Sequence, residues 1–183
     1  MNLPGALAAL LLRGPGHGYL LQAMLDRELG RLWVTRPSQV YLTLGRMNRD
    51  GFVTLRRVRQ TTRPDRHVFE LTKRGIGLAT DWLFEPGPAE EIALKLAVCR
   101  VARPGRFVEL IDILERDRMA VVHALRGVLS STSGFERHAI ALDLARAQAD
   151  LRWLSSLRQR ASELLAVPSA EGSAVEGSEA KLA

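Results

Sequence analysis

The sequence has little of what disulfide frameworks and metal centres require. It contains one cysteine, Cys99, in 183 residues, so no disulfide can form within the chain and a cysteine-based zinc or iron-sulfur site in one chain is excluded. The four histidines have no helical metal-ligand spacing, so we expect neither a metal nor a cofactor. Cys99 lies in an apolar stretch, which favours a buried, inert thiol over a redox sensor.

Long apolar runs are also lacking. No run of 18 apolar residues is present, and the apolar start, Leu3 to Leu12, has no basic segment before it and is interrupted at Arg13. A membrane span and a secretory signal are therefore not expected, and the sequence predicts a cytoplasmic protein. A glycine-rich phosphate loop, a nucleophile elbow and strand-helix alternation are missing too, so we do not expect an enzyme.

Positive charge is present in excess, and the excess lies in one half of the chain. The formal net charge is +6. Residues 1–85 contain 13 arginines and lysines against seven aspartates and glutamates, whereas the two kinds are equal in number in the remainder. A general preference for arginine as the surface cation would explain its abundance but not this asymmetry. The first half is therefore predicted to bind a polyanion, and nucleic acid fits this charge.

Helical periodicity predicts three helices at the start of the chain, over residues 3–12, 17–29 and 37–49. In the second helix one side is apolar and the opposite side polar. The apolar side is expected to hold Leu20, Leu21, Met24, Leu25 and Leu29, and the polar side Gln22, Asp26 and Arg27. In the third helix Val40, Leu44 and Met47 recur at helical spacing and are expected to face inward.

The periodicity then changes to that of strands. Residues 52–60 and 66–72 are rich in valine, phenylalanine, leucine and threonine and flank the breaker stretch 61–65, which predicts a β-hairpin with a basic tip. Thr72 can cap a fourth helix that runs to about Phe84. The proline-rich stretch that follows predicts a domain boundary near residue 86, where the charge also changes.

Helical signals continue to residue 165, with helices expected over 90–101, 106–129 and 136–165. The last carries a stripe at the spacing of a coiled-coil seam, which is broken at Arg158. The stripe consists of Ile140, Leu144, Ala147, Leu151, Leu154, Ala161 and Leu165. It predicts a homodimer interface, and the alternative is that it packs against the other two helices of its own chain.

Three helices followed by a two-stranded hairpin form the order of a winged helix-turn-helix. The expected fold class is mostly α with a small β-hairpin: a winged helix-turn-helix domain at 1–85, an α-helical dimerisation domain at 86–166 and a disordered tail at 167–183. The third helix would enter the major groove of double-stranded DNA, and the hairpin tip would reach the backbone or the minor groove. The predicted DNA-contacting residues are Ser38, Gln39, Tyr41, Leu42, Thr43, Arg46, Arg49, Arg63 and Arg66.

Several separated motifs occur in order across the first domain. They are Gly14-Pro15-Gly16-His17-Gly18-Tyr19, Gly30 with Trp33, Pro37-Ser38-Gln39-Val40-Tyr41 with Leu44, Asp50-Gly51-Phe52-Val53, and Arg63-Pro64-Asp65-Arg66 before Leu71-Thr72 and Gly75. With these motifs the chain closely resembles the PadR family of bacterial transcriptional regulators. It departs at Leu42, where the family often has proline, and at Phe69, where it often has tyrosine. Neither departure affects the predicted fold, but Leu42 lies on the expected DNA side.

The resemblance implies a regulator that represses transcription as a homodimer on a palindromic operator. Contacts across the dimer are predicted for Ile140, Leu144, Leu151, Leu154 and Leu165. A small aromatic or hydrophobic effector is also implied, and the candidate lining residues are Trp33, Trp82, Phe107, Met119 and Trp153, each of which can instead be a core residue. A winged helix that contacts only proteins, without specific DNA binding, is the alternative function.

Two matched residues have expected physical roles. His17 is expected at a helix start rather than as a ligand, and Tyr41 is expected to bury its ring and offer its hydroxyl to a phosphate, unless it is a plain core tyrosine.

Overall fold

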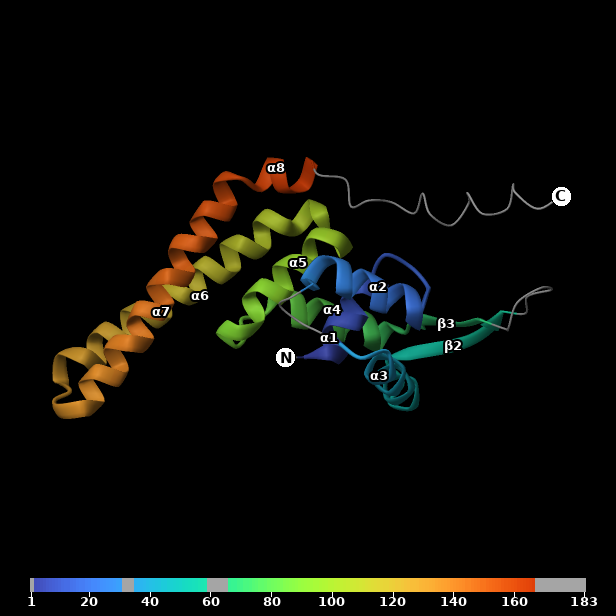
Figure 1. The fold of residues 1–183 in the computed structure, drawn as a ribbon, viewed down its shortest axis with the longest axis horizontal. Helices are drawn as coiled ribbons and strands as arrows, with labels where there is room; N and C mark the ends of the chain where they lie inside the picture. The colour runs from blue at the N-terminus through green and yellow to red at the C-terminus, as the bar shows by residue number, and fades with distance from the viewer. Residues whose placement is uncertain (1, 31–34, 59–65, 167–183) are drawn as a thin grey trace.

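The computed structural model of the protein describes residues 2–30, 35–58 and 66–166. Its elements are α1 (Leu3–Leu11), β1 (Gly16–His17), α2 (Gly18–Leu29), α3 (Pro37–Arg49), β2 (Val53–Val58), β3 (Arg66–Leu71), α4 (Lys73–Phe84), η2 (Ala89–Glu91), α5 (Ile92–Ala102), η3 (Pro104–Arg106), α6 (Phe107–Ser131), α7 (Gly134–Gln159) and α8 (Ala161–Ala166). The fold is mostly helical with one small antiparallel sheet, and the order of a winged helix-turn-helix is confirmed (Figure 1). The predicted tail at 167–183 lies outside the described residues.

Helix α1 is the centre of the first unit and is buried all round. It begins where the Asn2 side chain accepts a hydrogen bond from the Gly5 backbone N–H at 2.9 Å. Every residue from Gly5 to Leu11 is buried, and α1 packs against α3, α4 and α5. The Trp82 ring of α4 lies so close that a Cβ at Gly5 would approach it to 2.4 Å. An all-apolar helix of this kind is stable only inside a core.

The sheet has three strands in the order β1-β3-β2, all antiparallel. The β2-β3 hairpin is the predicted one, with Val53 opposite Leu71 and Val58 opposite Arg66. Strand β1 was not predicted, because two residues are too few to show a strand period; it pairs Gly16 with Phe69. The strand places His17 directly before α2, where its Nδ1 accepts from the Leu20 backbone N–H, so its predicted role at a helix start is confirmed.

The apolar core is continuous across residue 86. Helix α5 packs against α1 and α2, and its Arg100 forms an ion pair with the buried carboxylate of Glu28 in α2. Just after α5, Arg103 Nη1 donates to the Leu12 carbonyl at the end of α1 at 3.0 Å. The boundary expected near residue 86 is therefore not a boundary of the core, because α5 completes the packing of the first helices.

Helices α6 and α7 form a long antiparallel hairpin, here called the arm, that extends away from the sheet (Figure 1). The prediction of a single helix over 136–165 is wrong, because α7 ends at Gln159 and the chain turns at Arg160 before α8 begins. Within the chain the stripe is buried at Ala147, Leu154 and Ala161. Its remaining members, Ile140, Leu144, Leu151 and Leu165, are half-buried. Part of the stripe therefore packs inside its own chain.

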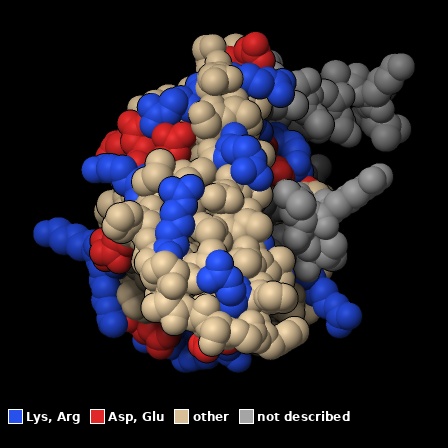
Figure 2. All heavy atoms as spheres, turned by 90° about the vertical axis from the view of Figure 1, so that its left-hand side faces the viewer, with Lys and Arg blue, Asp and Glu red and all other residues tan. Residues whose placement is uncertain are grey.

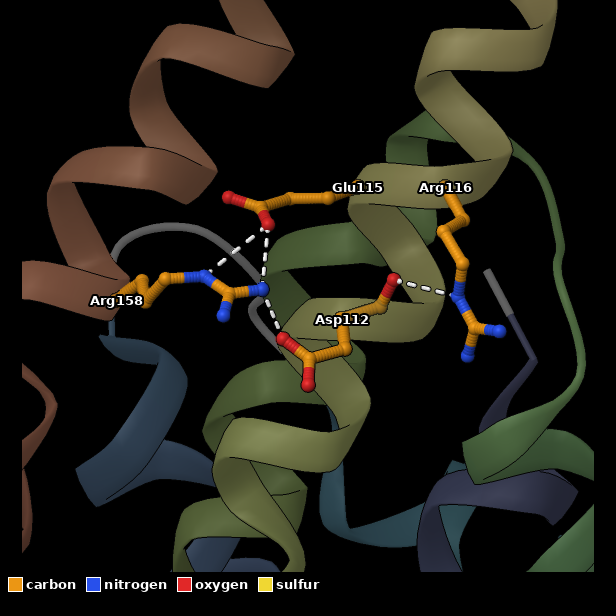
Figure 3. A network of polar contacts seen from close by, with 4 residues as sticks. All are labelled: Asp112, Glu115, Arg116 and Arg158. Carbon is orange, nitrogen blue, oxygen red and sulfur yellow. Dashed lines mark hydrogen bonds and ion pairs between the residues drawn. The ribbon is translucent and has the colours of Figure 1, made fainter.

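The interruption of the stripe at Arg158 has a structural explanation (Figure 3). Arg158 reaches from α7 to two carboxylates of α6: its Nε and Nη2 donate to Glu115 Oε2 at 3.1 and 2.6 Å, and Nη2 also pairs with Asp112. Hydrogen bonding to Glu115 raises the pKa of Arg158. An ion-pair network thus replaces an apolar contact at this seam position.

Cys99 is fully buried, as predicted. Burial raises the pKa of its thiol to about 12, and its Sγ donates weakly to the Arg103 carbonyl at 3.6 Å. Across the described ranges, no helix combines the length and apolar character that crossing a bilayer requires.

Candidate nucleic-acid interface

Helix α3 is held by its inner face. Val40, Leu44 and Met47 are buried, as the spacing predicted. Pro37 occupies the first turn, and the Arg36 backbone N–H donates to Gln39 Oε1 at 3.2 Å, which closes the N-terminal turn. The whole outer surface of α3 is therefore available to a partner.

The outer surface of α3 carries the residues that the sequence assigned to it, with two differences. Ser38, Gln39, Tyr41, Leu42, Arg46 and Arg49 are exposed. Thr43 is half-buried. The expected burial of the Tyr41 ring is wrong, because the residue is 47% exposed. The ring instead lies across Gly18 of α2, where an added Cβ would come within 2.6 Å of it, so a larger residue there would displace the Tyr41 ring.

The corner between α3 and the hairpin is fixed by hydrogen bonds to three backbone carbonyls. The Phe52 N–H donates to the Met47 carbonyl at 2.8 Å, and Thr72 Oγ1 donates to the Gly51 carbonyl at 2.7 Å. Arg74 of α4 donates to the Asp50 carbonyl at 2.9 Å and lies over the Phe52 ring. These bonds hold the hairpin in one orientation relative to α3.

The hairpin adds arginines that sequence reasoning missed. Arg56 and Arg57 on β2 are exposed, and because successive side chains of a strand alternate, they project from opposite faces of the sheet. The sequence did contain a signal for them, because two adjacent arginines lie in the stretch that was predicted as the first strand of the hairpin. Of the predicted wing residues, Arg63 lies outside the described residues, and Arg66 pairs with Val58 through its backbone while its side chain lies outside them.

The four candidate effector residues that the structure describes, Trp82, Phe107, Met119 and Trp153, do not line one pocket. Trp82 and Phe107 are core residues, and Trp82 Nε1 donates to Glu91 Oε2 at 3.0 Å. Met119 and Trp153 are exposed on the arm, and Trp33 lies outside the described residues. The prediction of a shared effector pocket is therefore wrong for the four described residues.

A buried charged group beside Trp82 was also missed. Lys95 of α5 is 3% exposed, and its Nζ donates to the Glu85 carbonyl at the end of α4 at 2.6 Å. Burial lowers the pKa of Lys95, whereas the neighbouring Glu91 acts in the opposite direction. Lys95 and Glu91 thereby join the end of α4 to the start of α5.

These elements define a class: a winged-helix protein whose helix-turn-helix is α2 and α3, whose wing is the β2-β3 hairpin, and which carries a helical arm. Residues 7–78 match the Transcriptional regulator PadR-like family. The first half of the chain is therefore similar to this family of transcriptional regulators.

Named relatives are similar to the chain over part of its length. It is 31% identical over 117 residues to the probable transcriptional regulator Rv1176c of Mycobacterium tuberculosis, covering 64% of this chain and 56% of that protein. It is 33% identical over 86 residues to the negative transcriptional regulator PadR of Bacillus subtilis, covering 47% of each. The chain thus spans about half the length of these curated relatives.

A solved structure is similar over a longer span. Bacillus subtilis PadR in complex with operator DNA is 25% identical and matches 87% of this chain and 98% of that one, with a TM-score of 0.43.

Proposed function

We propose that the protein is a DNA-binding transcriptional regulator, and specifically a repressor that binds a palindromic operator as a homodimer. One observation carries the proposal: the outer surface of α3 is polar and basic and is held rigidly beside an arginine-bearing wing. All of the excess positive charge of the chain lies in this half. In winged-helix docking, such a helix reads base edges while the wing binds the sugar-phosphate backbone.

Gln39 is the proposed base-reading residue at the start of α3. Its Oε1 already accepts from the Arg36 N–H. A carbonyl oxygen has two lone pairs, so the same atom can accept a second hydrogen bond from adenine N6 while Nε2 donates to N7. The capping bond would then hold the side chain ready for adenine.

Binding at several salt concentrations tests the proposal, after the preferred duplex has been selected from random DNA. Arg63→Ala and Arg66→Ala should weaken binding to all duplexes alike and lower the salt slope by about one unit each. Gln39→Ala and Thr43→Ala should relax preference at particular base pairs, by on the order of 1–3 kcal/mol for a bidentate contact. Arg116→Ala, on the arm, is the matched control for loss of charge.

The result that contradicts this assignment is a preference that Gln39→Ala leaves unchanged and Arg63→Ala alters. A wild-type protein that shows no salt-dependent binding to any duplex would instead favour a winged helix that contacts only proteins.

The proposed homodimer uses the arm. Large apolar side chains are exposed along α6 and α7: Met119, Val128, Phe135, Leu142 and Trp153. Seen from the end of the arm, a band of uncharged surface runs down the molecule, crossed by only a few basic side chains (Figure 2). Leu142→Glu or Trp153→Glu should give a monomer in sedimentation experiments, whereas a tight dimer in both variants would contradict this interface.

Release by a small hydrophobic or aromatic effector completes the proposed function. A candidate location is a cleft of about 230 Å³ between the end of α1, β3 and α4. It is lined by apolar side chains including Leu11, Leu71 and Ile76, and by the charged residues Arg13, Glu70 and Arg103. An effector acts only if it binds the released form more tightly than the DNA-bound form. Ile76→Trp should fill the cleft and abolish the response to any compound that releases DNA; an unchanged response would place the effector elsewhere.

A further inference from the structure

Gln22 lies on a face of α2 that the sequence pattern did not assign to it. It was expected on the polar side of the helix, with Leu20 inside. Gln22 is instead 6% exposed, and Leu20 is 44% exposed. The side chain of Leu29 lies outside the described residues. The apolar face of α2 is thus built on Leu21, Met24 and Leu25, with one buried amide beside them.

The amide nitrogen of Gln22 joins α2 to the segment that leads into α3. Its Nε2 donates to Thr35 at the carbonyl oxygen, 2.8 Å away, and at Oγ1, 3.2 Å away. It also donates to the Asp26 carboxylate one turn along α2, at 2.8 and 2.9 Å. A carboxylate and a backbone carbonyl can only accept, so they fix which end of the amide faces them.

The other end of the same amide has no hydrogen-bond partner among the described residues. Gln22 Oε1 is buried and accepts no hydrogen bond from any residue that the structure describes. Burying an acceptor without a donor is unfavourable, and an apolar side chain of the same length would avoid it. The position therefore combines one buried acceptor, which no described residue pairs, with a donor end that is bonded to Thr35 and Asp26.

The hydrogen bonds of Gln22 hold the segment that leads into α3. Thr35 directly precedes Arg36, the N-cap residue of α3, whose N–H is held by Gln39. Thr35 is held by Gln22 across 13 residues of chain. The start of α3 is thus attached to α2 at one residue and to its own first turn at the next, which sets the angle at which α3 leaves α2.

We propose that Gln22 is a positioning residue for sequence discrimination: through Thr35 it sets the direction of α3 and thereby the placement of Gln39 and the other outer residues against base edges. The inference rests on the proposed DNA-binding function. Base contacts depend on sub-ångström placement, whereas phosphate contacts tolerate small rotations. Loss of Gln22 should therefore lower discrimination more than general DNA affinity.

The test compares Gln22→Met with the wild type on two duplexes: one selected by the wild-type protein from random DNA, and a shuffled duplex of the same composition. Methionine keeps the unbranched shape but cannot donate a hydrogen bond. We expect the ratio of the two affinities to fall by about tenfold, while affinity for the shuffled duplex and the salt slope stay unchanged.

Gln22→Lys is the matched rescue variant. A lysine ammonium can donate to both the Asp26 carboxylate and the Thr35 carbonyl and carries no acceptor to be left unpaired. Discrimination should therefore be retained in Gln22→Lys. A purely structural role for Gln22 would predict that the melting temperature changes in either variant while the affinity ratio stays the same.

Asp26→Ala keeps the experiment decisive if Gln22→Met does not fold. Asp26 is exposed, and its removal frees the Gln22 amide to rotate away from Thr35, so the affinity ratio should fall by a smaller factor. An unchanged ratio in folded Gln22→Met, or in Asp26→Ala if that is the variant available, overturns the inference. A wild-type protein that selects no sequence refutes the proposed function itself, and the two failures are thus distinguishable.

Discussion

Leu154→Ala tests whether the seam stripe of α7 is used inside the chain. Leu154 is 0% exposed within a single chain and belongs to the common apolar core. Truncating a fully buried leucine removes its transfer free energy and leaves a cavity, which together cost about 2–5 kcal/mol. At a urea m-value of about 2 kcal/mol per molar, the unfolding midpoint should fall by about 1–2.5 M.

The assay is urea unfolding followed by circular dichroism, at two protein concentrations about a hundredfold apart. The destabilisation in Leu154→Ala should be the same at both concentrations, because Leu154 packs against residues of its own chain. Leu142→Ala is the matched control: Leu142 is 52% exposed on the same helix, so its destabilisation should be within about 0.5 kcal/mol for the single chain and should grow only where dimers contribute. A destabilisation below about 1 kcal/mol in folded Leu154→Ala, or one that depends on concentration, would refute the intrachain packing.

Three further predictions concern single groups. Burial raises the pKa of the Cys99 thiol to about 12, so the thiol should resist alkylation in the folded protein. Its contribution to the free energy of unfolding is present at neutral pH and should decline as the pH rises from the usual thiol pKa toward 12, which unfolding of the wild type and Cys99→Ala at several pH values measures. Thr72→Ala removes the cap bond to the Gly75 N–H and should cost about 1 kcal/mol in thermal unfolding, with Thr80→Ala as the comparison. Arg100→Met should lower the free energy of unfolding by about 1–3 kcal/mol, because it removes a partner of the buried Glu28 carboxylate. Arg27→Met should lower it less, because Arg27 is more exposed than Arg100, and equal losses in the two variants would contradict this ranking.

The sequence predicted those parts of the fold that depend on local pattern. The inner face of α3 was identified correctly because Val40, Leu44 and Met47 repeat over two turns of one helix. The cap at Thr72 followed from the residue type at a change of period. For the same reason the exposed residues of α3 were found, although the half-burial of Thr43 was not.

Features decided by distant parts of the chain could not be predicted in this way. Gln22 is buried with its amide bonded to Thr35, and a helical pattern contains no information on that contact. The Tyr41 ring lies over Gly18 of another helix, a contact on which the periodicity of α3 contains no information. The continuity of the core past residue 86 depends on α5 folding back onto α1 and α2, whereas the proline-rich composition suggested a break.

The arm also acts as a lever. Helix α6 has 25 residues and at 1.5 Å rise per residue is about 37 Å long. A rotation of about 10° at its base, near the end of α5 and η3, would move its far end by about 6 Å, nearly the rise of two base pairs of DNA. In a dimer joined through the arms, small changes of angle at the base would thus become changes of operator spacing, and the ion pairs of Arg158 that clamp α7 to α6 would determine how stiffly that motion is transmitted.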